Sequence, residues 1–150
     1  MRITNKTGYT LHGFLEGDEQ ELISATQPIT ASVIVLQLER EFLFGFNINR
    51  RQWELPGGRI EQGETPRECA FRELEEESSQ CLADLEFAGL AHMQRPSGDY
   101  KYTAVYKGRT EKLQAFVAND EWNEIKLRGL AEQDDGADLI HLEFIQRMAV

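Results

Sequence analysis

Runs of apolar residues along this chain predict a β-sheet built around one central strand. From Ile29 to Leu38 the chain carries four consecutive aliphatic residues, Val33 to Leu36, and an unbroken run of this kind is typical of a strand buried on both faces. A short link, Glu39 to Glu41, precedes Phe42 to Ile48, in which aromatic residues alternate with others. We therefore place residues 29–38 at the sheet centre with residues 42–48 as a hairpin partner.

Shorter apolar segments predict the remaining strands of this sheet. Tyr9–Leu15 is an expected edge strand, and the acidic segment Glu16–Glu19 after it is an expected turn. The other predicted strands are Trp53–Leu55, Leu85–Met93, Tyr100–Tyr106 and Trp122–Leu127.

Two segments have the spacing of amphipathic helices. Pro66 to about Ser78 is preceded by Thr65 and carries Glu68 at its third position, which is a capping box, and its apolar side holds Ala70, Phe71 and Leu74. A final helix is expected from Ala137 to Met148. Two helices around a multi-stranded sheet indicate an α+β fold, arranged as an α/β/α sandwich with a mixed sheet.

Three glutamates on the first helix call for an explanation. At about 100° per residue, Glu73, Glu76 and Glu77 share one arc of about 100°, where like charges repel. A solvated acidic face is the ordinary interpretation of such a cluster, and taken alone the glutamates favour it. A hard divalent cation is the alternative, because carboxylate oxygens are its usual ligands.

The residues before the helix favour the cation. The capping box fixes where the helix begins, and Leu55-Pro56-Gly57-Gly58 predicts a turn in which backbone without a Cβ can approach a ligand closely. A bare carbonyl from this turn can then face the carboxylates.

The spacing of Gly58, Glu64 and the run Arg72–Glu77 resembles the signature of the Nudix hydrolases, and Trp53–Gly58 resembles the lead-in of MutT-like members. The chain departs from that signature at Ser79, where the family usually has Gly, and at Gln80, where it usually has an aliphatic residue. These departures concern the loop after the helix. A left-handed non-Gly residue there costs about 1 kcal/mol, which a folded domain tolerates.

The resemblance implies metal-assisted hydrolysis of a phosphoanhydride. It gives Glu73, Glu76, Glu77 and the carbonyl of Gly57 as ligands of Mg²⁺, with Mn²⁺ as a possible substitute. Such cations polarise phosphate oxygens and lower the pKa of a bound water.

Four further residues are candidates around this centre. Arg72 has Glu68 and Glu76 one helical turn away and is expected to orient carboxylates, although a surface ion pair is nearly as good an interpretation. Glu64 is a ligand, a supporting partner of the ligands or an exposed glutamate, and Arg59 either contacts a phosphate or is solvated. Glu121, on the loop 118–121, is the best candidate for a separate general base, against a plain surface turn.

Composition narrows the class of protein. The 150 residues fit one domain, 1–150, and a formal net charge of -10 argues against nonspecific binding to nucleic acid or anionic membrane. No apolar run is long enough for export or membrane insertion, and Cys69 and Cys81 form no zinc motif, so we expect a cytoplasmic protein with free thiols. The oligomeric state, monomer or homodimer, is open.

Several functions fit these residues. The leading hypothesis is a MutT-like pyrophosphohydrolase that converts a nucleoside triphosphate, either an ordinary or an oxidised one, to the monophosphate and pyrophosphate. An ADP-ribose or nucleotide-sugar diphosphatase is the nearest rival, since its members tend to carry a proline where Pro96 stands, about sixteen residues past Gln80. A noncatalytic nucleotide-binding or sensing module is the alternative of another class.

The sequence leaves base recognition and the histidines unassigned. Phe46, Tyr100, Tyr102 and Trp122 could each stack on a base, although such aromatics more often lie in the core. The three isolated histidines are expected to be surface or core residues and not catalysts: His12, His92 and His141.

Overall fold

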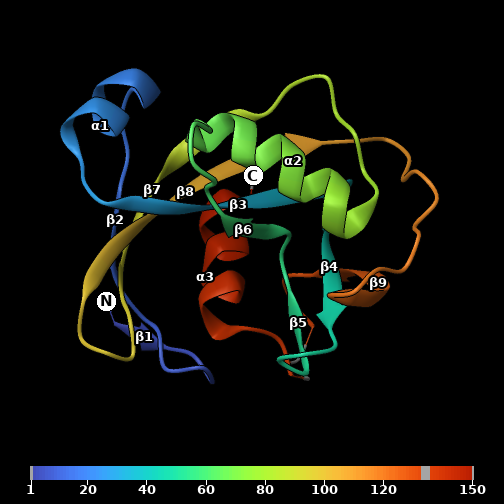
Figure 1. Cartoon of the computed structure of the whole chain (residues 1–150). Helices are drawn as coiled ribbons and strands as arrows, with labels where there is room; N and C mark the ends of the chain where they lie inside the picture. Colours follow the sequence, from blue (N-terminus) through green and yellow to red (C-terminus); the bar gives the residue numbers. More distant parts are fainter. Residues whose placement is uncertain (1, 133–135, 150) are drawn as a thin grey trace.

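The computed structural model describes residues 2–132 and 136–149, which form one nine-stranded sheet and three helices (Figure 1). The strands are β1 (Ile3–Thr4), β2 (Thr10–Leu15), β3 (Ile29–Leu38), β4 (Glu41–Asn47), β5 (Gln52–Glu54), β6 (Gly57–Arg59), β7 (Glu86–Gln94), β8 (Tyr100–Arg109) and β9 (Trp122–Gly129). The helices are α1 (Glu19–Ala25), α2 (Pro66–Ser78) and α3 (Leu139–Met148). β3 and β8 pair in parallel and the other pairs are antiparallel, so the predicted mixed sheet is confirmed.

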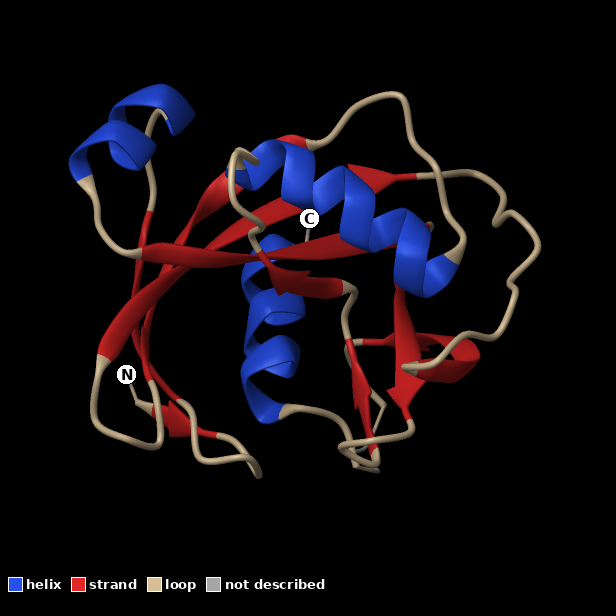
Figure 2. Cartoon of the chain, in the orientation of Figure 1, coloured by secondary structure: helices blue, strands red, loops and turns tan. Residues whose placement is uncertain are grey.

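The strand β3 is central, as its apolar run predicts. Val33 and Val35 face the core beneath α3, whereas Ile34 and Leu36 face the core beneath α2, because successive side chains of a strand point to opposite faces. All four are buried. Figure 2 shows α2 and α3 on the two sides of the sheet, which is the predicted sandwich.

The sheet divides just beyond the β3–β4 hairpin. β3 and β4 pair only next to their link, and β6 then takes the place of β4 along β3. β4 continues between β5 and β9. α2 packs against both β3 and β6, so its polar side lies where the two halves of the sheet separate.

Three elements were not predicted. β1 pairs with β2, so the expectation that residues 9–15 form an edge is wrong. The segment expected to be a turn at 16–19 instead leads into α1, capped by Asp18. α1 has only seven residues, with two adjacent aliphatic ones, so its sequence is too short to show the apolar spacing that predicts a helix. β6 has two glycines and is a strand because it pairs with β3.

None of the helices among the described residues has the length and hydropathy needed to cross a membrane.

Candidate active site

The helix α2 begins and ends as its sequence predicts. The Thr65 side chain accepts a hydrogen bond from the Glu68 N–H (3.1 Å), and the Glu68 carboxylate accepts one from the Thr65 N–H (2.9 Å). The predicted capping box is therefore confirmed, and the Glu68 carboxylate is engaged by the cap, whereas Arg72 bonds to other carboxylates. At the other end Ser79 is left-handed, with φ 64°, and its N–H donates to the Glu75 carbonyl.

The strand β6 turns its backbone toward α2 at alternate positions. The carbonyl of Pro56 and the N–H of Ile60 bond to β3, so the N–H and carbonyl of Gly57 and Arg59 point away from β3. The Gly57 N–H donates to Oε1 of Glu77 at 2.8 Å. Because the carbonyl of a strand residue points to the same side as its N–H, the Gly57 carbonyl is directed toward the same region.

Gly58 leaves room for the Glu73 carboxylate against the strand β6. A Cβ on Gly58 would lie 2.5 Å from Cδ of Glu73, so the Glu73 carboxylate would have to move from its present position. The glycine thus lets the Glu73 carboxylate lie directly against the backbone of β6.

Arg72 is the hub of the exposed half of the cluster. Its guanidinium makes a bidentate pair with Glu64, with Nε–Oε2 at 2.6 Å and Nη2–Oε1 at 2.8 Å. Its Nη1 also donates to Glu73 (2.8 Å) and Glu76 (3.2 Å), and its Nη2 donates to the Arg59 carbonyl (3.0 Å). A simple surface ion pair would not have this many partners. The guanidinium fixes the positions of three carboxylates.

These contacts separate the pKa values of the carboxyl groups. The hydrogen bonds from Arg72 lower the pKa of Glu64 to about 2, so this residue is a permanent anion that holds Arg72. Burial raises the pKa of Glu73, and Arg72 acts in the opposite direction.

Glu77 lacks this compensation. It is 3% exposed, and within the part of the chain that the structure describes it forms no ion pair. Burial, together with the nearby carboxyl of Glu121, raises the pKa of Glu77 to about 10, against the opposing hydrogen bond from Gly57. Two carboxyl groups in such proximity favour sharing a proton or binding a cation.

A single asparagine brings Glu121 to this position. The Nδ2 of Asn119 donates to the carbonyls of Glu76 (3.1 Å) and Glu77 (3.0 Å) at the end of α2. Its Oδ1 accepts from the backbone N–H of Glu121 (3.0 Å) and of Trp122 (2.9 Å). Sequence reasoning missed Asn119, although an asparagine two residues before the candidate base is typical of a turn closed by its own side chain.

The two departures from the Nudix signature hold the same loop. The Ser79 hydroxyl accepts from the Val117 N–H at 3.0 Å. Gln80 is buried, and its side chain donates to the Gln114 carbonyl (2.9 Å) and accepts from the Gln114 N–H (2.8 Å). A glycine and an aliphatic residue would provide neither set of bonds, so these positions tie residues 114–121 to the end of α2.

A pocket of about 230 Å³ lies on the α3 side of the sheet, with Gly57 in its wall. The N–H of Leu55 donates to Nδ1 of His141 at 3.0 Å, which gives this histidine a structural contact. The four aromatics considered for base stacking do not line the pocket. Trp122 is buried over Gly45, Phe46 packs edge-on against Trp53, and Tyr100 and Tyr102 stack on His92.

The structure therefore brings together most of the residues that the sequence singled out. Glu73, Glu76 and Glu77 lie beside β6, with Glu64 behind Arg72 and Glu121 beside Glu77. Within residues 2–132 and 136–149, no three acidic, histidine or cysteine groups are already arranged as a metal site. The donor set nevertheless fits a hard divalent cation, because it consists of carboxylate oxygens and a carbonyl in a region with excess negative charge.

Cys69 and Cys81 are both free thiols, as expected. Cys69 is buried, and burial raises its pKa to about 11, so it remains protonated and unreactive.

Comparison with known proteins gives a family and a fold. The model of the NUDIX domain family matches residues 26–147. An RNA pyrophosphohydrolase of Alkalilimnicola ehrlichii is 37% identical over 57 residues, which are 38% of this chain and 32% of that protein. The RNA pyrophosphohydrolase of Francisella tularensis subsp. mediasiatica is 33% identical over 55 residues, which are 37% of this chain and 36% of that protein. The match thus spans about a third of the length of these curated relatives.

Solved structures show the same fold over more of the chain. A Bacillus subtilis pyrophosphohydrolase superposes with a TM-score of 0.72 at 16% identity, covering 99% of this chain and 92% of that one. A MutT NUDIX hydrolase from Burkholderia pseudomallei gives a TM-score of 0.70 at 16% identity, covering 83% of this chain and 100% of that one. At this identity the likeness concerns the fold alone.

Proposed function

Because this chain belongs to the NUDIX domain family, we propose that it is a divalent-metal-dependent pyrophosphohydrolase of nucleoside polyphosphates. The single observation that carries the proposal is the pair Glu77 and Glu121. A buried carboxyl group next to a second one, without an ion-pair partner among the described residues, is costly for stability and is expected at a functional site.

We propose Glu73, Glu76, Glu77 and the Gly57 carbonyl as the residues that hold Mg²⁺, with Mn²⁺ as a substitute. When bound, such a cation withdraws charge from the phosphate oxygens and makes water more acidic. Arg72 holds Glu73 and Glu76 in position, and Glu64 holds Arg72.

In this proposal Glu121 is the general base. It lies on the loop that Asn119 attaches to α2, and its carboxylate accepts the proton of the attacking water. The water attacks a phosphorus atom of the polyphosphate, and the bond to the bridging oxygen breaks.

The leading substrate is a nucleoside triphosphate, cleaved to the monophosphate and pyrophosphate. A second candidate is the 5′-triphosphate end of an RNA, which the names of the curated relatives favour. The diphosphatase of ADP-ribose or nucleotide sugars has less support, because Pro96 lies exposed in the β7–β8 turn and does not line the pocket.

The test is a panel of nucleoside triphosphates, a 5′-triphosphorylated oligonucleotide and ADP-ribose, incubated with Mg²⁺ and read by product chromatography. We expect pyrophosphate or phosphate release from at least one 5′-polyphosphate. If no member of the panel is hydrolysed with either Mg²⁺ or Mn²⁺, the noncatalytic binding module is the better description.

A further inference from the structure

Three cationic side chains lie on the α3 face of the sheet, beside the pocket that contains Gly57. Arg59 pairs with Ala31, which pairs with Thr103 on β8, and Lys101 lies two residues before Thr103. Side chains two residues apart on a strand share a face, so Arg59 and Lys101 belong to the same side of the sheet.

Arg95 joins this group from the turn that follows the neighbouring strand β7. Met93 pairs with Lys101, and the Arg95 N–H donates to the Asp99 carbonyl at 2.7 Å, so the pairing continues one step past β7. Arg95 therefore follows Met93 on the same face, diagonal to Lys101. Burial and the charges of Arg95 and Arg59 lower the pKa of Lys101 to about 8, which agrees with the proximity that the register gives. In a chain with a net charge of -10, this local excess of positive charge is unexpected.

Lys101 lines the pocket and contacts no carboxylate there. Its Nζ lies 5.5 Å from the centre of the Tyr9 ring, and the stretches 2–132 and 136–149 contain no ion pair of Lys101, Arg59 or Arg95. The two acidic residues that line the same pocket are engaged elsewhere. Glu54 pairs with Arg50 at 2.6 Å, and Asp138 caps α3.

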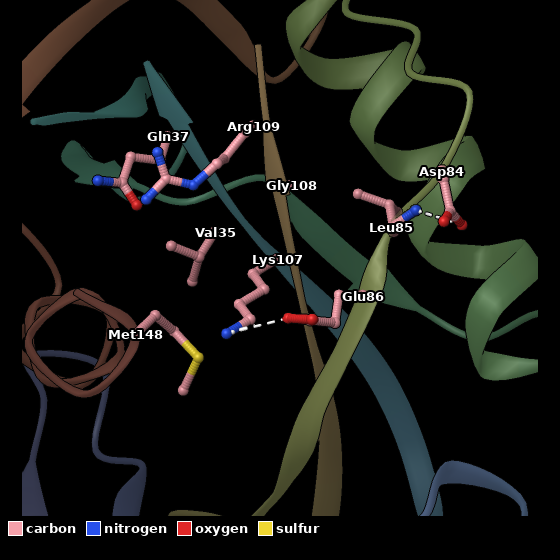
Figure 3. Close-up of a pocket in the computed structure, with 9 residues that line it drawn as sticks. All are labelled: Val35, Gln37, Asp84, Leu85, Glu86, Lys107, Gly108, Arg109 and Met148. Carbon is pink, nitrogen blue, oxygen red and sulfur yellow. Dashed lines mark hydrogen bonds and ion pairs between the residues drawn. The ribbon is translucent and has the colours of Figure 1, made fainter. Parts of the chain in front are cut away.

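A second lysine shows what a paired lysine looks like on this sheet. Lys107 lines a separate hollow of about 460 Å³, together with Val35, Leu85 and Met148. Figure 3 shows its ammonium group directed at Glu86, with Nζ–Oε2 at 3.0 Å. Among residues 2–132 and 136–149 Lys101 has no comparable partner, which leaves its ammonium group available to an anion.

We propose that Lys101, with Arg59 and Arg95, binds a phosphate group of the substrate in the pocket, in addition to the phosphates at the glutamates of α2. This inference rests on the proposed function and narrows its substrate class. The substrate is then a nucleotide with a phosphate group beyond those that lie at the glutamates of α2. That phosphate is either the internucleotide phosphodiester of a 5′-triphosphorylated oligonucleotide or the distal phosphate of a dinucleoside polyphosphate.

The first experiment measures anion binding without catalysis. Pyrophosphate is titrated by calorimetry into metal-free protein in EDTA, using the wild type, Lys101→Met, Lys101→Arg and the control Lys107→Met. Loss of a charge-assisted hydrogen bond is expected to weaken binding about tenfold to hundredfold in Lys101→Met. Lys101→Arg should retain most of the affinity, and Lys107→Met should bind as the wild type does.

Equal affinity in Lys101→Met and the wild type would overturn the proposal, as would an equal loss in Lys107→Met. Thermal melts of each variant establish that it is folded. Should Lys101→Met fail to fold, Arg59→Gln takes its place, with a smaller loss of affinity expected because Arg59 is exposed.

The second experiment separates the two sources of the phosphate. Values of kcat/KM are compared for a nucleoside triphosphate, a 5′-triphosphorylated dinucleotide and a dinucleoside tetraphosphate. In Lys101→Met we expect kcat/KM to fall about tenfold or more for the substrate whose extra phosphate binds Lys101, mainly through a higher KM. For the nucleoside triphosphate kcat/KM should change little. An equal loss for all three would contradict the inference. If the wild type hydrolyses none of them, the proposed function fails, whereas the result of the pyrophosphate titration is unaffected.

Discussion

The two sides of β6 carry opposite excesses of charge. On the α2 side, Glu77 is buried beside Glu121, and no cation pairs with either among the described residues. On the α3 side, Lys101 lies with Arg59 and Arg95 without a carboxylate partner in the same ranges. The contrast teaches that each side is arranged for a ligand of the other sign. A metal–polyphosphate complex would provide both a cation and an anion. Removing the charge on either side of β6 therefore tests whether that side binds such a ligand.

Removing the metal should have the largest effect. We expect EDTA to abolish turnover completely and to leave the helical circular dichroism unchanged, because α2 is stabilised by its capping box and its buried apolar side. Activity should return on addition of Mg²⁺ or Mn²⁺. Loss of helical signal on chelation would mean that the metal is structural.

Neutralising the ligands comes next. Glu76→Gln and Glu77→Gln should each lower kcat by about a thousandfold or more, because the site loses a charge that holds the cation. Stability should hold or rise in both, and rise more in Glu77→Gln, since Glu77 is buried and Glu76 is exposed.

Chromatographic rates and thermal melts measure these two effects. The exposed Glu75→Gln on the same helix is the control, with a wild-type rate expected. If Glu76→Gln and Glu77→Gln both hydrolyse nucleotides at the parental rate, or both melt at clearly lower temperature, the cluster is a structural acidic face.

Glu121→Gln tests the second carboxyl group of the pair. Loss of a general base should lower kcat by about 10²–10⁴-fold and should leave the affinity for the metal little changed. The neighbouring Asp120→Asn, also on the exposed loop, should behave as the wild type. A wild-type rate in Glu121→Gln would shift the role of base to a glutamate of α2.

Asn119→Ala should have a smaller effect on the same loop. It removes the bonds to the carbonyls of Glu76 and Glu77, and the resulting displacement of Glu121 is expected to lower kcat about tenfold to hundredfold with KM retained. The exposed Asn123→Ala on β9 is the control. A higher KM with a normal kcat would instead indicate that Asn119 contacts the substrate.

The smallest effect concerns the cationic side and pH. The pKa of Lys101 in the folded protein, about 8, lies below its unfolded value, so the folded state binds fewer protons between pH 8 and 10.5. The lysine is therefore destabilising below pH 8, and this cost disappears as pH rises through that window. Relative to the wild type, Lys101→Met should be more stable by about 1–2 kcal/mol at pH 7, with the difference closing by pH 10. Urea unfolding in phosphate-free buffer measures it, and a pH-independent difference would contradict the assignment.

The acidic side could be predicted from sequence, and the cationic side could not. The glutamates lie on one short helix whose beginning is fixed by local capping chemistry, so their mutual position follows from helix geometry. Lys101 and Arg59 meet only because β3 lies between β6 and a parallel β8. Parallel pairing needs long-range topology, which periodicity does not encode.

The same limit explains the other misses. β6 has no apolar pattern of its own and becomes a strand by pairing, and the short α1 is fixed by the contacts of Glu19 with Arg67 and the Tyr106 hydroxyl. From the sequence Gln80 is only a departure from the Nudix signature. Its role depends on hydrogen bonds with Gln114, which is 34 residues further along the chain. The expectations of one domain over 1–150, a cytoplasmic location and an open choice between monomer and homodimer stay predictions.

The packing of Trp122 on Gly45 has a consequence for how this sequence can evolve. A Cβ at position 45 would lie 1.9 Å from the indole ring, and the indole is fully buried next to the residue that we propose as the base. Neither position can therefore drift by itself: an alanine at 45 would have to follow a smaller residue at 122, and the intermediate with a void beneath the loop would be selected against. Among descendants of this chain, Gly45 and Trp122 should be inherited as a pair.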